Sequence, residues 1–437
     1  MIPTYKLSCY TYTHQLENGD LILHNSFMGS LARVPQQQLP AIEPYLNREI
    51  SFPMDDENDL LKELCKNRFF IESDSDEQSE IDEILSYERD MHTMHLIVLP
   101  HEQCNFRCSY CYESFENGKI TPLVVSAIKR YVREQMPRFK MLKVYWFGGE
   151  PLLASDVITG LSEFFIDYCE QNEKRYGAFI TTNGYLLNPS LAAKLLSLSI
   201  TNYQITIDGP ETLHNANRRL AGGGKTYKRI LQNVLSFKEQ PYDFRVSIRV
   251  NFEPLHMPEI SHWVENEIAP AFVNDERFSL NYNLIENWDN VSIYDSSSLD
   301  AFPLKLNLIG TTYNSPITRT CVHDYLMPNT SVCYAAKKSS LIFGADGSLY
   351  KCTVAFKDPS NQVGYVDQAG NLVFDQDKLN LWIDTAHLDC SRCTKCSFYP
   401  SCQSRKCPKI GIETGKPVCP FSVSEYHHLL ELAASEH

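Results

Sequence analysis

The sequence lacks the features of a membrane-bound or exported protein. No run approaches the roughly 18 consecutive apolar residues of a transmembrane helix, and the stretch from Met1 to Tyr10 has no signal-peptide pattern. We therefore expect a cytoplasmic protein with no membrane partner. An excess of positive charge is also absent, because 40 Lys and Arg oppose 54 Asp and Glu, which gives a net charge of −14. Since nucleic-acid binding needs a basic surface, we expect no nucleic-acid partner.

Cysteine, in contrast, is abundant, with 15 residues in a chain of 437. In a chain without an export pattern, thiols stay reduced, and clustered cysteines usually bind a metal or an iron–sulfur cluster. Three cysteines form a short motif near residue 104, and nine form a distal group after residue 320. Cys9, Cys65 and Cys169 stand apart, and we expect them to be small buried hydrophobic residues.

The chain is too long for one small core, and its pattern predicts three consecutive sections. Residues 1–92 show short extended segments, two helical stretches at 39–46 and 59–66, and an acidic linker, which together resemble a winged-helix-like unit. Residues 93–300 alternate between strands and helices. Residues 301–437 are rich in cysteines and turns, and end in a helix expected over 422–434.

The middle section predicts an α/β fold. Six β-branched or apolar runs read as strands, and helical patterns separate them. The predicted strands are 95–99, 143–147, 178–182, 203–207, 245–251 and 279–284. Such alternation predicts a parallel sheet, either open or closed into a partial barrel, with the functional site at the carboxyl ends of the strands.

Directly after the first predicted strand comes Cys104-Asn-Phe-Arg-Cys108-Ser-Tyr-Cys111. Three thiolates on one short loop can hold three irons of a four-iron cluster, which requires four ligands. The fourth iron is then open to an exogenous ligand, as in catalytic metal sites. The alternative is a zinc site, but zinc in structural sites prefers a closed set of four ligands.

Polar and glycine-rich turns follow the next three strands. The second strand ends in Gly148-Gly149-Glu150-Pro151, where the glycines let a ligand approach the backbone and the carboxylate can accept from an amine. Short polar side chains at the later strand ends offer contacts to a ribose or a carboxylate, although capping of a turn is an equally good explanation. These side chains are Asn183, Thr206 and Asp208, with His214, Asn215 and Arg218 downstream.

In spacing and order these motifs resemble the radical S-adenosylmethionine (SAM) enzymes, over about residues 95–420. The resemblance implies a partial (β/α)6 barrel in which Cys104, Cys108 and Cys111 hold a [4Fe-4S] cluster that chelates and reductively cleaves SAM. It also implies that eight further residues contact SAM. Beyond the cluster, no catalytic residue is assigned. The eight residues are Gly148, Gly149, Glu150, Pro151, Asn183, Thr206, Asp208 and Arg218. Asn215 departs from the aspartate usual in the family.

The distal cysteines resemble the SPASM extension, which binds two auxiliary [4Fe-4S] clusters and would bring the total to three. The resemblance implies that one set of cysteines holds the nearer cluster and a second set holds the farther one. The fourth ligand of the nearer cluster is either Cys321 or Cys390, or that position stays open. The nearer set is Cys321, Cys333, Cys352 and Cys407, and the farther set is Cys393, Cys396, Cys402 and Cys419. Two zinc sites are the alternative, since the Cys-x2-Cys spacing is shared.

The N-terminal section resembles the precursor-recognition elements of ribosomal-peptide maturases, which capture a leader by strand addition. We therefore expect an oxidoreductase that installs a carbon–carbon or thioether cross-link in a precursor peptide, served by a flavodoxin- or ferredoxin-like electron donor. An anaerobic sulfatase maturase is the main alternative, but Thr353 stands where those enzymes have an aspartate. A non-catalytic iron–sulfur or zinc-binding protein is the second alternative.

Overall fold

The computed structural model describes residues 3–54, 57–89, 92–273, 275–285, 301–328, 333–385, 393, 395–402, 407–415, 419 and 422–435. Contacts divide the chain into two compact units. The first unit comprises residues 1–90, 321–333 and 386–437, and the second comprises 91–320 and 334–385. This division differs from the three consecutive sections expected from the sequence, because the two ends of the chain belong to one unit.

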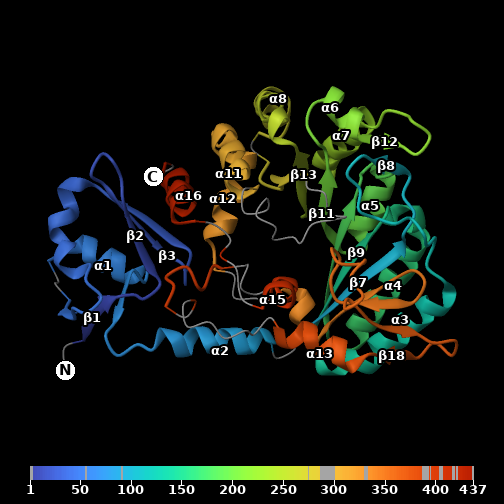
Figure 1. The fold of residues 1–437 in the computed structure, drawn as a ribbon, viewed down its shortest axis with the longest axis horizontal. Coiled ribbons are helices and arrows are strands. Elements are labelled where there is room, and N and C mark those ends of the chain that lie inside the picture. The colour runs from blue at the N-terminus through green and yellow to red at the C-terminus, as the bar shows by residue number, and fades with distance from the viewer. Residues whose placement is uncertain are drawn as a thin grey trace. The chain divides into compact units, whose positions relative to one another are not determined.

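The second unit is built on a ten-stranded sheet in the order β14-β13-β11-β10-β9-β7-β15-β16-β17-β18. The six strands from β7 to β14 run parallel and in chain order, as Figure 1 shows, and helices such as α4 and α5 lie along them. They are β7 (Thr93–His101), β9 (Met141–Gly148), β10 (Arg175–Thr182), β11 (Ile200–Thr206), β13 (Arg245–Phe252) and β14 (Phe278–Leu284). The predicted α/β fold with six parallel strands is confirmed.

Four more strands extend this sheet beyond β7. Strand β15 pairs parallel to β7, and a short antiparallel meander follows it. These strands are β15 (Ser340–Phe343), β16 (Ser348–Tyr350), β17 (Gln362–Val366) and β18 (Leu372–Phe374). Part of the section expected to be a separate cysteine-rich domain therefore completes the sheet of the barrel.

Local sequence signals account for the start of helix α3. Helix α3 starts at Pro122, and the side chain of Thr121 caps it by accepting from Val124 N. The unit's α-helices are α3 (Pro122–Gln135), α4 (Ser155–Gln171), α5 (Pro189–Ser197), α6 (Glu211–Asn217), α7 (Tyr227–Ser236), α8 (Met257–Trp263), α9 (Ala269–Ala271), α11 (Ala301–Thr312) and α13 (Gln376–Asp384), while α12 (Pro316–Leu326) spans the boundary between the units. Short 3-10 turns are η3 (Met136–Arg138), η4 (Pro151–Ala154), η5 (Phe237–Glu239), η6 (Pro254–His256) and η8 (Tyr334–Ala336), and η7 (Val264–Ile268) is a π-turn.

The first unit contains two small antiparallel sheets, ordered β5-β1-β6 and β2-β3-β4. Its elements are β1 (Thr4–Leu7), β2 (Thr11–Gln15), β3 (Leu21–Asn25), β4 (Ser30–Val34), β5 (Phe52–Pro53), β6 (Phe70–Glu72), α1 (Asp59–Lys66), α2 (Glu77–Arg89), α15 (Pro408–Thr414) and α16 (Val423–Ala434). The helix predicted over 39–46 is wrong. Two 3-10 turns, η1 (Gln36–Ala41) and η2 (Glu43–Tyr45), replace it because Pro40 and Pro44 interrupt helical hydrogen bonding.

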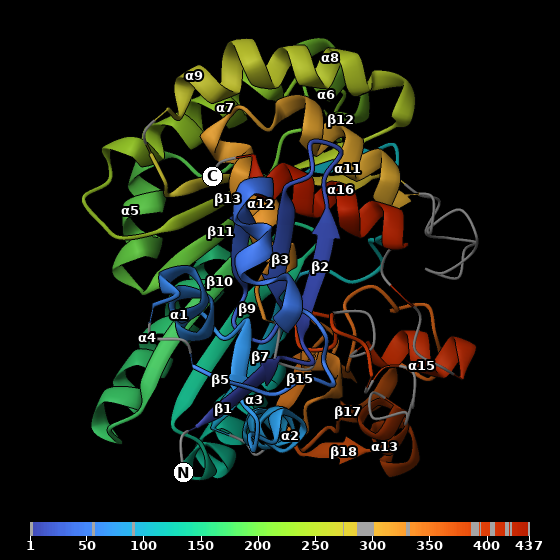
Figure 2. The same cartoon turned by 90° about the vertical axis from the view of Figure 1, so that its left-hand side faces the viewer.

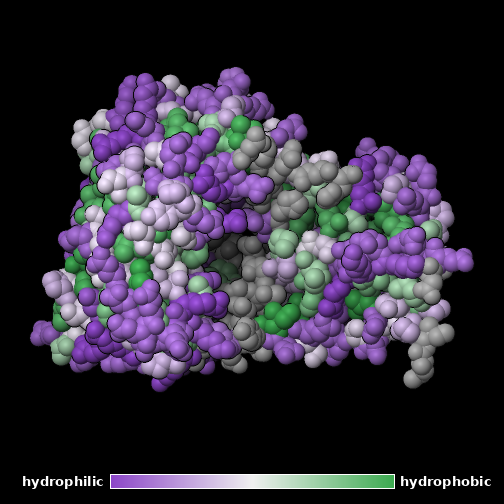
Figure 3. Space-filling view, turned by 180° about the vertical axis from the view of Figure 1, so that it is seen from behind, coloured by the Kyte–Doolittle hydropathy of each residue, from purple (hydrophilic) through white to green (hydrophobic). Residues whose placement is uncertain are grey.

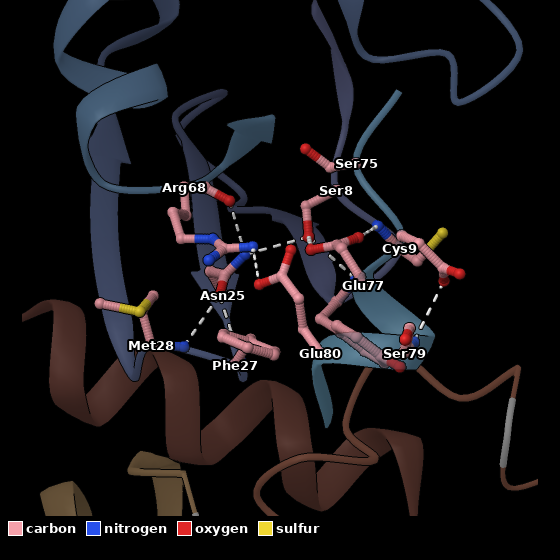
Figure 4. A network of polar contacts seen from close by, with 12 residues as sticks. Ser8, Cys9, Asn25, Phe27, Met28, Arg68, Ser75, Glu77, Ser79 and Glu80 are labelled. Atoms are coloured by element: carbon pink, nitrogen blue, oxygen red, sulfur yellow. Dashed lines mark hydrogen bonds and ion pairs between the residues drawn. The ribbon is translucent and has the colours of Figure 1, made fainter. Parts of the chain in front are cut away.

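A buried polar network joins β1, the end of β3 and the start of α2 (Figure 4). Asn25 donates to Ser8 Oγ at 3.1 Å and to the carbonyl of Arg68 at 2.7 Å. The buried carboxylate of Glu77 accepts from Ser8 Oγ at 2.6 Å and from Cys9 N at 2.8 Å. Since an unpaired buried polar group is costly, this full pairing fixes helix α2 against the small sheets.

The C-terminal helix α16 packs against strand β3 in the same unit, as Figure 2 shows. Ser422 and Glu425 form a capping box at its start. Buried His24 of β3 contacts Tyr426 Oη at 2.5 Å through Nδ1 and the carbonyl of Leu326 at 3.0 Å through Nε2. Because a carbonyl only accepts, Nε2 carries a proton. Burial disfavours the charged imidazolium, so the imidazole is neutral in the folded chain and Nδ1 accepts from the tyrosine.

This neutral histidine makes the first unit sensitive to acid. Burial lowers the pKa of His24 to about 4, from an ordinary value of 6.5. The unfolded chain thus binds a proton that the folded unit excludes, so stability present above pH 6.5 is lost as the pH falls toward 4. We expect a loss of about 3 kcal/mol from this residue. Amide hydrogen exchange in β3 and α16 measures it, with His24→Gln as the comparison; equal pH dependence in both proteins would contradict the assignment.

Hydrophobic side chains lie mainly in the interior. On the face drawn in Figure 3, hydrophilic residues predominate and hydrophobic ones are scattered. Among the described residues, no helix is long and apolar enough to cross a bilayer.

Candidate functional site

The loop after β7 carries the three-cysteine motif. Within it, strand β8 (Phe106–Cys108) pairs antiparallel with β12 (Arg218–Leu220), so that Cys108 lies opposite Arg218. Ser109 N donates to the carbonyl of Asn217 at 3.0 Å and extends this ribbon. The motif is thus held by a second segment more than 100 residues away in the sequence.

The glycine turn after β9 supports the same loop. Gly149 N donates to the carbonyl of His101 at 3.2 Å. A Cβ atom on Gly149 would lie 2.4 Å from the carbonyl oxygen of Glu102, and one on Gly148, at a φ of +119°, would lie 2.7 Å from that of His101. The sequence predicted close approach of a ligand here; in the structure, the backbone of the cysteine loop itself makes a close approach.

Glu150 joins the ends of two strands. Its fully buried carboxylate accepts from Thr182 Oγ1 at 2.7 Å, Asn183 N at 2.8 Å and Leu152 N at 3.0 Å. Burial raises the pKa of Glu150, and the hydrogen bond from Thr182 opposes that shift. The carboxylate therefore ties the end of β9 to the end of β10. Its predicted contact with a cofactor amine stays a prediction.

A cavity of about 160 Å³ opens at the carboxyl ends of the strands. All three cysteines of the motif line it, together with residues from six segments. Its lining is Cys104, Phe106, Cys108, Tyr110, Cys111, Tyr112, Glu113, Phe147, Gly148, Gly149, Thr181, Thr182, Asn183, Gln204, Thr206, Arg218, Arg249, Asn251, Leu284 and Ile285. Five of the eight predicted cofactor contacts line the cavity; Glu150, Pro151 and Asp208 do not.

Sequence reasoning missed several lining residues. Tyr110 and Tyr112 lie between and after the cysteines, where the motif drew attention only to thiols. Arg249 and Asn251 alternate along β13 with the buried apolar residues Ile248, Val250 and Phe252. That period-two alternation was a usable signal, because polar residues on one side of a barrel strand face a site or solvent.

The three thiols lie in a water-poor setting. Burial raises the pKa of Cys104 to about 12 and that of Cys111 to about 11, and it also raises the pKa of Cys108, against the effect of Arg218. Asn183 Nδ2 lies 3.7 Å from Cys104 Sγ and donates to it. No three Cys, His, Asp or Glu side chains in the described residues converge on one metal ion. An iron–sulfur cluster takes its thiolates on separate irons, so three thiols around one cavity fit such a cluster.

A hydrogen-bonded polar group, with Asp208 fully buried at its centre, lies beside the motif. Tyr110 Oη donates to Asp208 Oδ2 and accepts from Arg218 Nη1 at 2.8 Å. Asn251 donates to Asp208 Oδ1 from its backbone N at 3.0 Å and from Nδ2 at 3.1 Å. Both oxygens of Asp208 are therefore engaged by protein groups. Burial raises the pKa of Asp208, and the Arg218 guanidinium opposes that shift.

The segment after β11 is held by His214 and Asn215. Asp208 N donates to His214 Nδ1 at 3.2 Å, which leaves Nε2 to donate to Thr226 Oγ1 at 3.1 Å. Asn215 Oδ1 accepts from Thr226 N at 2.8 Å and Tyr227 N at 3.1 Å, at the start of α7. A carboxylate would accept the same two bonds. The departure from the family's aspartate therefore preserves this contact.

The distal cysteines are divided between the units. Cys352 follows β16 in the second unit, where Asn361 Oδ1 accepts from Cys352 N at 2.8 Å. Cys321 (in α12), Cys333, Cys393, Cys396, Cys402, Cys407 and Cys419 belong to the first unit. Two hydrogen-bonded turns contain cysteines of this group. Cys396 N donates to the carbonyl of Cys393, and Cys402 N donates to the carbonyl of Tyr399. Cys390 lies outside the described residues, and the two predicted ligand sets stay predictions.

Comparison with known proteins agrees with this site. Residues 98–255 match the family model of the radical SAM superfamily. A cysteine-type anaerobic sulfatase-maturating enzyme of Clostridium perfringens is 23% identical over 344 residues, covering 70% of this chain and 86% of that protein. The mycofactocin maturase MftC of Mycolicibacterium smegmatis is 29% identical over 132 residues, covering 30% of this chain and 31% of that protein.

Solved structures support the same fold. The structure of native anSMEcpe with bound AdoMet and a Cp18Cys peptide has a TM-score of 0.58 and 18% sequence identity, and the match covers 79% of this chain and 97% of that one. At this identity the likeness speaks for the fold alone. Together with the family match and the three-cysteine cavity, it leads to one conclusion: the chain contains a radical SAM domain, which spans residues 98–255.

Proposed function

We propose that this protein is a peptide maturase that reductively cleaves SAM and installs an intramolecular carbon–carbon or thioether cross-link in a ribosomally made precursor peptide. The observation that carries the proposal is the placement of Cys104, Cys108 and Cys111 around one cavity at the carboxyl ends of parallel strands. When bound there, a [4Fe-4S] cluster and SAM supply a 5′-deoxyadenosyl radical that removes a hydrogen atom from carbon.

The chain's own residues give the cavity its character. Phe106 and Phe147 provide apolar walls that exclude water, and Arg218 and Arg249 bring positive charge to the lining. A guanidinium can pair with a carboxylate of the cofactor or of a peptide in bidentate geometry. Arg249 Nε donates to Asn251 Oδ1 at 2.8 Å, so its side chain is already oriented.

A peptide substrate is supported by the relatives. One is named for maturing sulfatases and another for maturing mycofactocin, and the solved structure is of a protein with AdoMet and a peptide bound. The first unit of this chain also has a cavity of about 460 Å³, lined by residues of β1, the start of α2 and the distal cysteine segment. Its lining carries the cations Lys6, Arg48 and Lys395 and the anions Asp76 and Glu77. We place the leader of the precursor peptide at this cavity.

Formylglycine formation in a sulfatase is the second candidate, favoured by the extent of the match to the sulfatase-maturating enzyme. Against it stands Thr353, at the position of the aspartate proposed as the base in those enzymes. Thr353 Oγ1 lies 2.8 Å from Tyr334 Oη, and its backbone N donates to the same oxygen at 3.1 Å. A hydroxyl engaged in this way is a poor base, so we favour the cross-link.

The products distinguish the two candidates. The experiment incubates the anaerobic, reduced full chain with SAM and the peptide encoded by a short neighbouring reading frame. We expect 5′-deoxyadenosine and a peptide that is lighter by two hydrogen atoms, one transferred to the deoxyadenosyl group and one lost as a proton and an electron. The product should not react with a hydrazide. A hydrazide-reactive aldehyde would instead establish formylglycine formation, and an unchanged peptide would contradict the cross-link.

Peptide capture has a separate readout. We expect Arg48→Gln to weaken binding of the labelled peptide while SAM cleavage without peptide stays unchanged. Arg33→Gln is the matched control, because Arg33 is an arginine of the same unit that pairs with Asp20 outside the cavity. Point variants are preferable to deletion of residues 1–90, since that segment shares one unit with the C-terminal residues. Equal affinity in both variants would place the leader elsewhere.

A further inference from the structure

The group formed by Tyr110, Asp208, Arg218 and Asn251 contains a buried pair of opposite charges. Asp208 is completely buried and Arg218 is 7% exposed. The link between them runs through the Tyr110 hydroxyl, which donates to the carboxylate and accepts from the guanidinium. Asn251 Nδ2 also donates to this hydroxyl at 3.0 Å. One oxygen atom of Tyr110 therefore positions both charged side chains.

The two charges are placed differently relative to the cysteine motif. Arg218 is the register partner of Cys108 in the β8–β12 ribbon, and it lines the cavity beside the thiols. Asp208 is buried and is not part of the cavity lining, and its oxygens are engaged by Tyr110 and Asn251. The cation therefore lines the cavity together with the motif, the anion does not, and both charges lie close enough to act on Cys108. In a buried setting of low dielectric constant, such an arrangement exerts a strong local field.

The buried Nε–H of Arg218 has no hydrogen-bond partner among the described residues. An unpaired buried donor is costly, and here it belongs to a cation whose side chain lines the cavity. Negative charge on cluster thiolates, or on a group bound to the cluster, would satisfy this donor. This observation is independent of the register pairing and points to the same place.

We propose that Tyr110 is a positioning residue, whose hydroxyl holds Asp208 and Arg218 so that this charge pair sets the reduction potential of the cluster bound by Cys104, Cys108 and Cys111. The inference rests on the cluster assignment in the proposed function. Reduction adds an electron to the cluster, so a nearby cation stabilises the reduced form and an anion destabilises it. The pair therefore tunes how readily the cluster accepts the electron that SAM cleavage requires.

Opposite shifts in potential test this inference. Anaerobic full-length protein with reconstituted clusters is titrated with a reductant and followed by electron paramagnetic resonance before SAM is added. Later addition of SAM identifies the responsive cluster by its change in spectrum. We expect Arg218→Gln to lower its midpoint potential, Asp208→Asn to raise it, and the double variant to return toward the unmodified value. A purely structural role would not produce opposite signs or this return.

Controls separate charge from position. Arg219→Gln removes a neighbouring but exposed cation, and we expect no shift because solvent screens its charge. Tyr110→Phe keeps both charges and the ring, and we expect amide hydrogen exchange in β8 and β12 of the metal-free full chain to become faster. The same exchange in Tyr176→Phe, a partly buried tyrosine of β10 whose hydroxyl contacts Ser162, should not change.

The outcomes are distinct. Shifts of the same sign, or absent shifts with a SAM-responsive cluster present, overturn the inference and leave the proposed function standing. Unchanged exchange in Tyr110→Phe removes the positioning role of its hydroxyl. If the unmodified protein has no SAM-responsive cluster, both the inference and the proposed function are wrong.

Discussion

Replacement of any one of Cys104, Cys108 and Cys111 by alanine is expected to reduce SAM cleavage to the uncatalysed background. All three thiols line one cavity and come from one loop, so each variant leaves a cluster with two protein ligands. A cluster relies on its thiolates for assembly as well as for reactivity. The measurement is formation of 5′-deoxyadenosine by the anaerobic, reduced chain, together with iron content.

The matched control is Cys169→Ala. Cys169 is buried in α4, away from the cavity lining, and its thiol behaves as a small hydrophobic group. We expect full iron content and normal turnover in this variant. In the three motif variants, iron should fall by about four atoms per chain. If any motif variant still cleaves SAM, the assignment of the radical SAM cluster to these cysteines is wrong.

Gly149→Ala is expected to have the next largest effect. The new methyl group would lie 2.4 Å from the carbonyl oxygen of Glu102 and 2.6 Å from that of Gln103. Both contacts are with backbone, which cannot rotate away as a flexible side chain can. Overpacking of this kind costs about 1–3 kcal/mol or displaces the neighbour. Here the neighbour is the loop that carries Cys104, and a shift near 1 Å can lower a rate by about 10²-fold.

A second glycine provides the comparison. Gly160 lies in helix α4, and an added Cβ atom would meet nothing within 4 Å. Gly160→Ala should therefore stabilise the chain by about 0.5–1 kcal/mol and leave turnover unchanged. Thermal unfolding and SAM cleavage are measured for both variants. Normal turnover in Gly149→Ala would show that the loop does not depend on this close approach.

The barrel strands could be predicted because their signals are local. Each of the six runs is apolar or β-branched, and polar turns bound it, so the pattern alone gives the strand. The ribbon of β8 and β12 gave no such signal. Its strands have three residues each, and their pairing depends on contact between segments more than 100 residues apart. The same reason explains why β15 to β18 were not expected to continue the sheet.

The sequence predicted the three thiols of the site better than it predicted the hydrogen-bond partners of the carboxylates around them. Spacing on one short loop predicted that Cys104, Cys108 and Cys111 act together, and all three line one cavity. Glu150 and Asp208 were chosen as carboxylates at strand ends, but the structure shows their oxygens engaged by protein donors. Sequence gives the presence of a carboxylate and not its partners. Those partners, including Thr182 and Tyr110, lie on other strands and loops.

The make-up of the first unit bears on how the protein is synthesised. Strand β3 leaves the ribosome early. Leu326 and Tyr426, which contact its buried His24, are translated much later. The N-terminal sheets therefore lack these contacts while the whole radical SAM domain is synthesised and begins to fold. Premature termination before α16 would leave that surface uncovered. Chains truncated in this way should be targets for chaperones and proteases even though their radical SAM domain is intact.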